Sequence, residues 1–126
     1  MKPLPLLLLT SVPDTPDPSA IARILVEERL AACCTLLARG ESFFIWNEQA
    51  ESAAECVMLI KTTNDRLEAL RDRPLDLHPY DIPELIEIPI AGGLASYMEW
   101  IVSARIPPRH ERFQEGRHPR LRSYLR

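Results

Sequence analysis

The stretch that decides the fold reads His78-Pro79-Tyr80-Asp81-Ile82-Pro83-Glu84-Leu85-Ile86-Glu87-Ile88-Pro89-Ile90. Its three prolines exclude a helix, because proline lacks a backbone N–H and biases the preceding residue toward extended geometry. From Glu84 onward the β-branched residues share one parity, which is the period of a strand with one strongly buried face. Pro83 and Pro89 fall at the two ends of this strand, where a missing donor is tolerated.

Polar chemistry is concentrated at the entrance of this predicted strand. An imidazole, a phenol and two carboxylates lie within seven residues, on His78, Tyr80, Asp81 and Glu84. We therefore predict that a catalytic or binding site, if the protein has one, lies at this end of the strand.

The rest of the chain divides into alternating apolar runs and helical patterns. The run Leu4 to Val12 contains four consecutive leucines, which predicts a strand covered on both sides. Asp17-Pro18 predicts the start of a helix that reaches about Ala32. Further strands are predicted at Cys34 to Ala38 and Ser42 to Trp46, with a bend or bulge at Arg39-Gly40, and at Glu51 to Lys61. A second helix is predicted from Asn64, with Leu67 and Leu70 inward and an interruption at Pro74. After a turn at Gly92-Gly93, a third helix is predicted that Pro107-Pro108 stops, with its inward residues at Leu94, Tyr97, Met98 and Ile101.

This order of elements predicts an α+β chain of the ferredoxin-like, split βαβ class, β-α-β-β-α-β with a further helix at the end. The sheet is antiparallel, the helices cover one face of it, and the first and third strands are central. Both central strands are apolar on two faces, so something other than the helices must cover the second face. Another copy of the chain is the simplest cover, which predicts a homo-oligomer.

Composition indicates one domain of ordinary globular character. The 126 residues carry a net charge of −3. Residues 1–104 hold 8 basic and 16 acidic residues, net −8, whereas 105–126 hold seven arginines against two glutamates, net +5. Three cysteines do not suggest a disulfide framework, and no targeting or membrane-spanning segment is apparent, so a cytoplasmic location is predicted.

Several ordered motifs resemble the CutA family of divalent-cation tolerance proteins. They are Glu27-Glu28-Arg29-Leu30-Ala31-Ala32-Cys33, Trp46, Ile60-Lys61-Thr62, His78-Pro79-Tyr80-Asp81-Ile82-Pro83-Glu84 and Tyr97-Met98-Glu99-Trp100-Ile101. The resemblance implies a stable homotrimer of ferredoxin-like subunits with PII-like architecture, tolerance to copper and other divalent cations, and no enzymatic activity. It places the family domain at 1–106 and leaves 107–126 as a basic C-terminal extension.

The resemblance also implies a copper site built from a cysteine near the end of the first strand and two consecutive histidines before Pro-Tyr. In this chain Thr10 or its neighbour and Leu77 occupy the cysteine and first histidine positions, so only His78 remains. One imidazole binds copper weakly. Replacement ligands that could approach His78 across a subunit boundary are Cys33, Cys34, Cys56, Asp81 and Glu84. No cofactor is expected to be required, and the candidate metal is copper or another divalent cation. The alternative role for His78 is to cap the preceding helix or to form a hydrogen bond with the backbone.

Two other functions compete with metal binding. A PII-like regulatory trimer would bind a small anionic ligand or a partner protein through a pocket of Trp46, Lys61, Tyr80 and Glu84, and a structural interaction module would bind no ligand. The competing interpretation of the pocket residues is that the aromatics pack, that Lys61 pairs with Glu84, and that the cysteines are small buried hydrophobes.

The arginines of the basic C-terminal extension could neutralise phosphates of a nucleic acid, but no nucleic-acid-binding motif accompanies them. The charge of the extension is better matched by the acidic core of its own or a neighbouring subunit. An enzyme is not predicted, because the sequence has no nucleophile elbow, phosphate loop or zinc-spaced histidine pair.

Overall fold

A computed structural model describes residues 2–14, 17–77 and 84–104, with the backbone alone for 74–77. In chain order the elements are β1 (Pro5–Pro13), α1 (Pro18–Glu27), β2 (Cys33–Trp46), β3 (Gln49–Thr63), a 3₁₀ turn (Asn64–Arg66) leading into α2 (Leu67–Leu77), β4 (Ile86–Pro89) and α3 (Ala95–Ala104).

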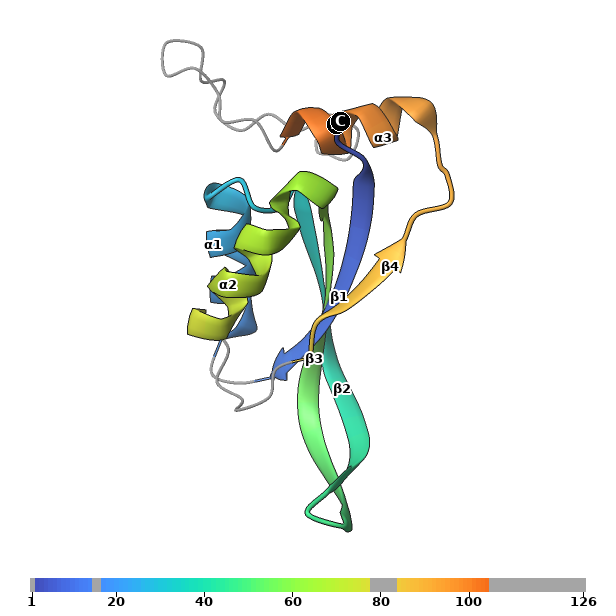
Figure 1. The fold of residues 1–126 in the computed structure, drawn as a ribbon. Coiled ribbons are helices and arrows are strands. Elements are labelled where there is room, and N and C mark those ends of the chain that lie inside the picture. The colour runs from blue at the N-terminus through green and yellow to red at the C-terminus, as the bar shows by residue number, and fades with distance from the viewer. Residues whose placement is uncertain (1, 15–16, 78–83, 105–126) are drawn as a thin grey trace, which may run out of the picture.

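The four strands form one antiparallel sheet in the order β2-β3-β1-β4. Helices α1 and α2 lie together on one face of this sheet, and α3 lies across one end of it (Figure 1). The arrangement confirms the ferredoxin-like prediction, with the first and third strands in the centre.

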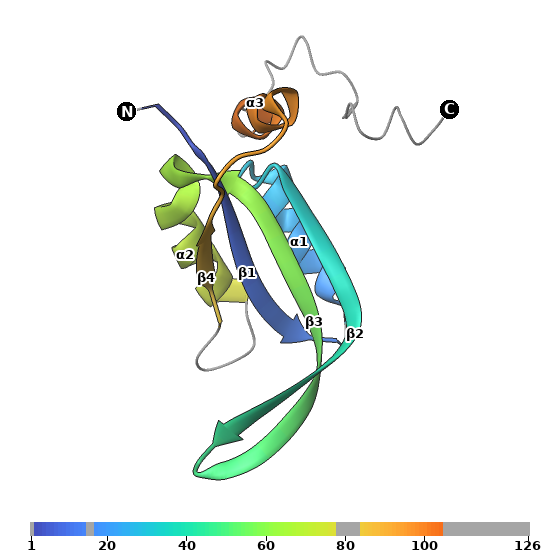
Figure 2. The same ribbon diagram turned by 90° about the vertical axis from the view of Figure 1, so that its right-hand side faces the viewer.

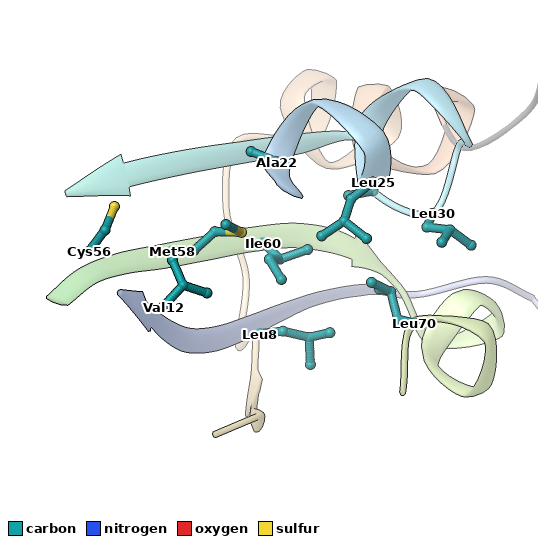
Figure 3. Packing of buried hydrophobic residues seen from close by; sticks show 10 residues of the cluster. Leu8, Val12, Ala22, Leu25, Leu30, Cys56, Met58, Ile60 and Leu70 are labelled. Carbon is teal, nitrogen blue, oxygen red and sulfur yellow. The ribbon is translucent and has the colours of Figure 1, made fainter. Parts of the chain in front are cut away.

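The hydrophobic core lies between the sheet and helices α1 and α2. Alternate residues of β1 and β3 point to this side, among them Leu8, Val12, Met58 and Ile60, all essentially inaccessible to solvent (Figure 3). The helices contribute Ala22, Leu25 and Leu70. Leu67 packs against the same cluster, so the inward positions predicted for α2 are confirmed.

The first helix begins where the sequence predicts but ends earlier. The Asp17 side chain accepts a hydrogen bond from the Ser19 N–H at 3.1 Å, and Pro18 occupies the first helical turn. The prediction that α1 reaches Ala32 was wrong, because Arg29 has φ 61° and the helix stops at Glu27. Ala31 and Ala32 are nonetheless buried: the chain turns there into β2, where the Ala32 N–H donates to the Lys61 carbonyl at 2.8 Å.

Three further expectations differ from the structure. The helix α2 continues through Pro74 to Leu77, although an interior proline removes a backbone donor and crowds the carbonyl four residues earlier. The strand predicted between Pro83 and Pro89 begins only at Ile86, and its isoleucine side chains are not covered within the chain, since Ile86 is 50% exposed. Leu94 is 74% exposed because it precedes α3, where its carbonyl accepts from the N–H groups of Tyr97 and Met98.

Strands β2 and β3 run beyond the other two strands as a two-stranded extension, which we call the hairpin arm (residues 39–55). The pairing of β2 with β3 shifts between Leu37 and Gly40, which confirms the predicted bulge, and Arg39 adopts φ 63° there. A side chain at Gly40 would lie 2.8 Å from the Glu55 carbonyl oxygen, so glycine is required at this crossing. Past the shift, the hairpin arm projects away from the helices (Figure 1).

Candidate functional site

The sheet face opposite α1 and α2, which we call the open face, is broadly apolar. Strand register places three rows of side chains across it, namely Ile86-Leu9-Leu59-Thr35, Ile88-Leu7-Lys61-Cys33 and Ser11-Val57-Leu37. Ile86 and Leu37 are about half exposed, and neither α1 nor α2 covers this face (Figure 2). The structure thus confirms that both central strands are apolar on two faces and leaves the second face uncovered within the chain.

Lys61 is the cationic residue of these rows, and α3 holds its ammonium group. Lys61 Nζ donates to the Tyr97 hydroxyl at 3.2 Å and lies 5.4 Å from the centre of the Tyr97 ring. Trp100 stacks on Tyr97 with ring centres 5.5 Å apart. This cluster places a positive charge against the Tyr97 ring, which Trp100 supports by stacking on it.

The predicted pair between Lys61 and Glu84 is not formed within the chain. Glu84 precedes β4, and its carbonyl accepts a hydrogen bond from the Thr10 hydroxyl at 2.5 Å. The role of Tyr97 as the partner of Lys61 was missed by the sequence analysis, because 36 residues separate them and no local pattern links the two.

The predicted ligand pocket is not assembled by one chain. Trp46 pairs with Gln49 near the tip of the hairpin arm, whereas Lys61 pairs with Leu7 and Cys33. Lys61 follows Gln49 by twelve positions in β3, a distance of about 40 Å along the strand. Trp46 and Lys61 can share a pocket only if different subunits supply them, and Tyr80 lies outside the described residues.

The described residues form an apolar pocket elsewhere, at the beginning of β1. It has a volume of about 370 Å³ and is lined by Leu4, Pro5, Leu6, Asn64, Pro89, Ile90, Gly92 and Met98. None of the predicted site residues lines it.

Cys33 and Cys34 are consecutive in β2 and therefore point to opposite faces of the sheet. Cys33 is on the open face, while Cys34 packs against the core and Cys56 is fully buried within it. Burial raises the pKa of the Cys34 thiol to about 12, and the neighbouring Cys33 adds to the shift. Burial also raises the pKa of the Cys56 thiol, to which the Asp14 charge contributes. The prediction that the cysteines are small buried hydrophobes is confirmed for Cys56, whereas Cys34 is partly buried and packs against the core.

These thiols are expected to resist labelling in the native protein. The thiolate is the reactive form, and a pKa near 12 leaves roughly one Cys34 thiol in ten thousand ionised at pH 8. Mass spectrometry after a brief exposure to iodoacetamide at pH 8 should find Cys34 and Cys56 unmodified, and fully modified once the protein is unfolded in denaturant. Rapid native labelling of Cys34 would contradict its placement.

The donors that the structure describes do not build a metal site by themselves. Within residues 2–14, 17–77 and 84–104, no three His, Cys, Asp or Glu side chains gather closely enough to hold an ion. His78 and Asp81, the first choices from the sequence, lie outside these ranges. Thr10, which the resemblance places at or next to the expected cysteine position, is buried, and its hydroxyl donates to the Glu84 carbonyl. A metal site would therefore need donors outside these ranges, such as His78 or Asp81, or donors from a second chain.

Comparisons with known proteins agree on one family. The family model for the CutA1 divalent ion tolerance protein matches residues 6–104. The divalent-cation tolerance protein CutA of Pectobacterium atrosepticum is 38% identical over 94 residues, covering 75% of this chain and 86% of its own length. The residues matched by the family model end at 104, before the basic C-terminal extension predicted at 107–126.

Solved structures agree with this match. The PII-like protein CutA from Nostoc sp. PCC 7120 superposes with a TM-score of 0.75 at 30% identity, over 80% of this chain and 97% of that one. The periplasmic divalent cation tolerance protein CutA from Archaeoglobus fulgidus superposes with a TM-score of 0.77 at 30% identity, over 82% of this chain and all of that one.

Because one relative is periplasmic, the cytoplasmic location of this chain stays a prediction. Among the described helices, none has the length and apolar character needed to cross a bilayer.

Proposed function

The chain belongs to the CutA1 divalent ion tolerance protein family, and from this premise we propose that it works as a homotrimer that binds a divalent metal ion, copper first, at a cleft between subunits near His78. The observation that carries the proposal is the open face. Its apolar rows leave Ile86 and Leu37 about half exposed, and a face of this breadth is normally covered in a stable protein. A closed assembly of sister subunits covers three such faces at once and brings segments of different chains together.

The donors near such a cleft are limited in kind. Cys33 is the thiol on the open face, whereas Cys34 is directed into the core with a pKa of about 12, so metal binding there would first have to remove a tightly held proton. His78, Asp81, Glu84 and Cys33 therefore form the proposed donor set, with copper favoured by the imidazole and the thiol. The proposed role is non-enzymatic, as the sequence predicts.

Calorimetric titration tests the metal site directly. Cu(II), Cu(I) and Zn(II) are titrated into the wild-type protein and into His78→Ala, with His118→Ala as the matched control outside the family domain. Binding heat should be present in the wild type and the control and absent in His78→Ala. Equal heats in all three proteins, or negligible heats in all three, would contradict a site at His78.

The Lys61 cluster favours a second candidate function, that of a PII-like regulatory trimer binding a small anionic ligand without direct metal binding. The Lys61 ammonium is held by the Tyr97 hydroxyl and ring, so within the described chain its charge is not neutralised by a carboxylate. A thermal-shift screen with nucleotides and small dicarboxylic acids tests this candidate, because a ligand that binds only the folded state raises the midpoint. The increase should vanish in Lys61→Gln and persist in Lys2→Gln; no increase with any compound would remove this candidate.

A further inference from the structure

The apolar pocket at the beginning of β1 has well-fixed walls but is not filled by the described chain. The Leu4 N–H donates to the Asn64 side-chain oxygen at 2.8 Å, and the Asn64 N–H donates to the Leu4 carbonyl at 2.9 Å, so β1 is tied to the turn before α2. On another side Met98 of α3 lies against Gly93, where an added Cβ would come within 2.9 Å of Met98 Cε. Leu4 lines the pocket and is still 56% exposed.

The lining of this pocket selects an apolar side chain as its occupant. Among the lining residues Asn64 alone has a polar side chain, and its oxygen already accepts the Leu4 N–H. Sites for small ligands combine an apolar lining with several convergent polar groups, which orient the ligand. A cavity of about 370 Å³ is also small for such a site. A large apolar side chain delivered by a protein segment fits this lining better than a free polar ligand.

The basic C-terminal extension starts close to the pocket. Helix α3 supplies Met98 to the lining and ends at Ala104, about 9 Å further along its axis. The beginning of β1 and α3 lie at the same end of the sheet (Figure 2). Phe113 is the first Phe, Tyr or Trp after Ala104, and the nine residues between the two positions span up to about 30 Å when extended. The tether is therefore long enough for the Phe113 ring to return to the pocket.

Charge favours the same placement. Residues 1–104 carry −8 and residues 105–126 carry +5, so the extension is attracted to its own domain. Exposed carboxylates directly follow two of the lining residues, on Asp65 and Glu99. In the extension, Arg109 and Arg112 shortly precede Phe113. The ring thus comes with two planar guanidinium groups, which are suited to pairing with carboxylates beside the pocket.

We propose that the basic C-terminal extension folds back on its own chain and seats the Phe113 ring in the apolar pocket, with Arg109 and Arg112 beside Asp65 and Glu99. The short tether gives the extension a high effective concentration at this pocket. None of the lining residues belongs to the three rows of the open face, so the proposal does not depend on how a trimer covers that face. It does not depend on metal binding either.

Limited trypsin digestion of the full-length protein tests the proposal, because trypsin cuts after arginine and a docked segment is cut only when it is released. The rates measured are those of cleavage after Arg109 and Arg112. A synthetic peptide of residues 105–126 that carries the same substitution, where there is one, gives the rate of each bond without docking. Arg71 in α2, left uncut, reports that the domain remains folded.

Two substitutions remove the contact from opposite sides. Phe113→Ser removes the ring and keeps every charge, with Tyr124→Ser as its matched control in the extension. Gly92→Trp fills the pocket, since a Cβ added at Gly92 meets nothing within 4 Å. Its matched control is Ala91→Trp, at an exposed neighbouring position that does not line the pocket.

Both bonds should be cut at least about five times more slowly in the wild-type protein than in the peptide, and within about two-fold of the peptide rate in Phe113→Ser and Gly92→Trp. The two control variants should keep the wild-type protection. Equal rates in the wild-type protein and the peptide would overturn the proposal. Protection that is lost in Gly92→Trp but kept in Phe113→Ser would assign the pocket to another occupant and would overturn it as well.

A disulfide distinguishes the extension of the same chain from that of a second copy. Ala91→Cys and Gln114→Cys are combined in a Cys33→Ser background, which removes the native thiol of the open face. After mild oxidation, a denaturing gel without reductant should show a bridge within one chain, at single-chain mass. A bridge between two chains, or no bridge, would contradict docking of the extension on its own chain.

Discussion

Replacing Leu9 with Lys is expected to break the proposed trimer into single chains. Leu9 lies in the middle row of the open face, between Ile86 on β4 and Leu59 on β3. In a single chain it is only half buried, so a lysine there can extend its ammonium group into water at small cost. In a trimer the same ammonium would be enclosed by sister subunits, at an effective penalty of several kcal/mol for each copy. Light scattering should therefore report a mass about one third of the wild-type value.

Leu94→Lys provides the matched control for this substitution. Leu94 is 74% exposed, precedes α3 and belongs to none of the three rows of the open face, so the same change of charge and size should leave the mass unchanged. A wild-type protein that scatters as a single chain, or a Leu9→Lys variant that keeps the full assembled mass, would refute the proposed covering of the open face.

Replacing Leu8 with Ala is expected to lower the stability of the fold itself by about 2–5 kcal/mol. Leu8 is the neighbour of Leu9 in β1 but points to the other side, where it is fully buried in the core with Met58, Ile60 and Leu70. The substitution removes buried methyl groups and leaves a cavity that the surrounding side chains fill only in part. For a domain of about 100 residues this loss lowers the thermal midpoint by roughly 10 °C or more.

Differential scanning calorimetry at one fixed protein concentration measures this effect, because the midpoint of an oligomer depends on concentration. Leu8→Met keeps most of the volume and should cost less than about 1.5 kcal/mol. Leu94→Ala, at an exposed position, should change the stability by no more than about 0.5 kcal/mol. A Leu8→Ala midpoint equal to that of Leu94→Ala would contradict the burial of Leu8.

Patterns that depend on neighbouring residues predicted most of the fold. The prolines around Ile86 and Ile88 predicted an extended segment, the leucine run of β1 predicted a central strand, and Asp17-Pro18 marked the beginning of α1. The end of α1 was predicted wrongly because Ala31 and Ala32 continue the helical period although they are buried after the helix has ended. Burial alone does not distinguish a helical position from a turn that packs against the same core.

The candidate site was less predictable, because its contacts join residues that are distant in the chain. The partner of Lys61 is Tyr97, and the choice of tyrosine over Glu84 follows from where α3 meets the end of the sheet. Trp46 lies on the hairpin arm, so its distance from Lys61 follows from the length of β2 and β3 and not from any motif. Separate motifs can identify the family without establishing which of their residues meet within one chain.

The two borders of the sheet differ in how much free backbone they offer. Strand β4 has four residues and ends in Pro89, which has no N–H to donate, whereas the opposite border is formed by the fourteen residues of β2. A short, proline-ended border discourages the addition of another strand, and a long one invites it. In a single chain the β2 border is therefore the place where another strand is expected to add.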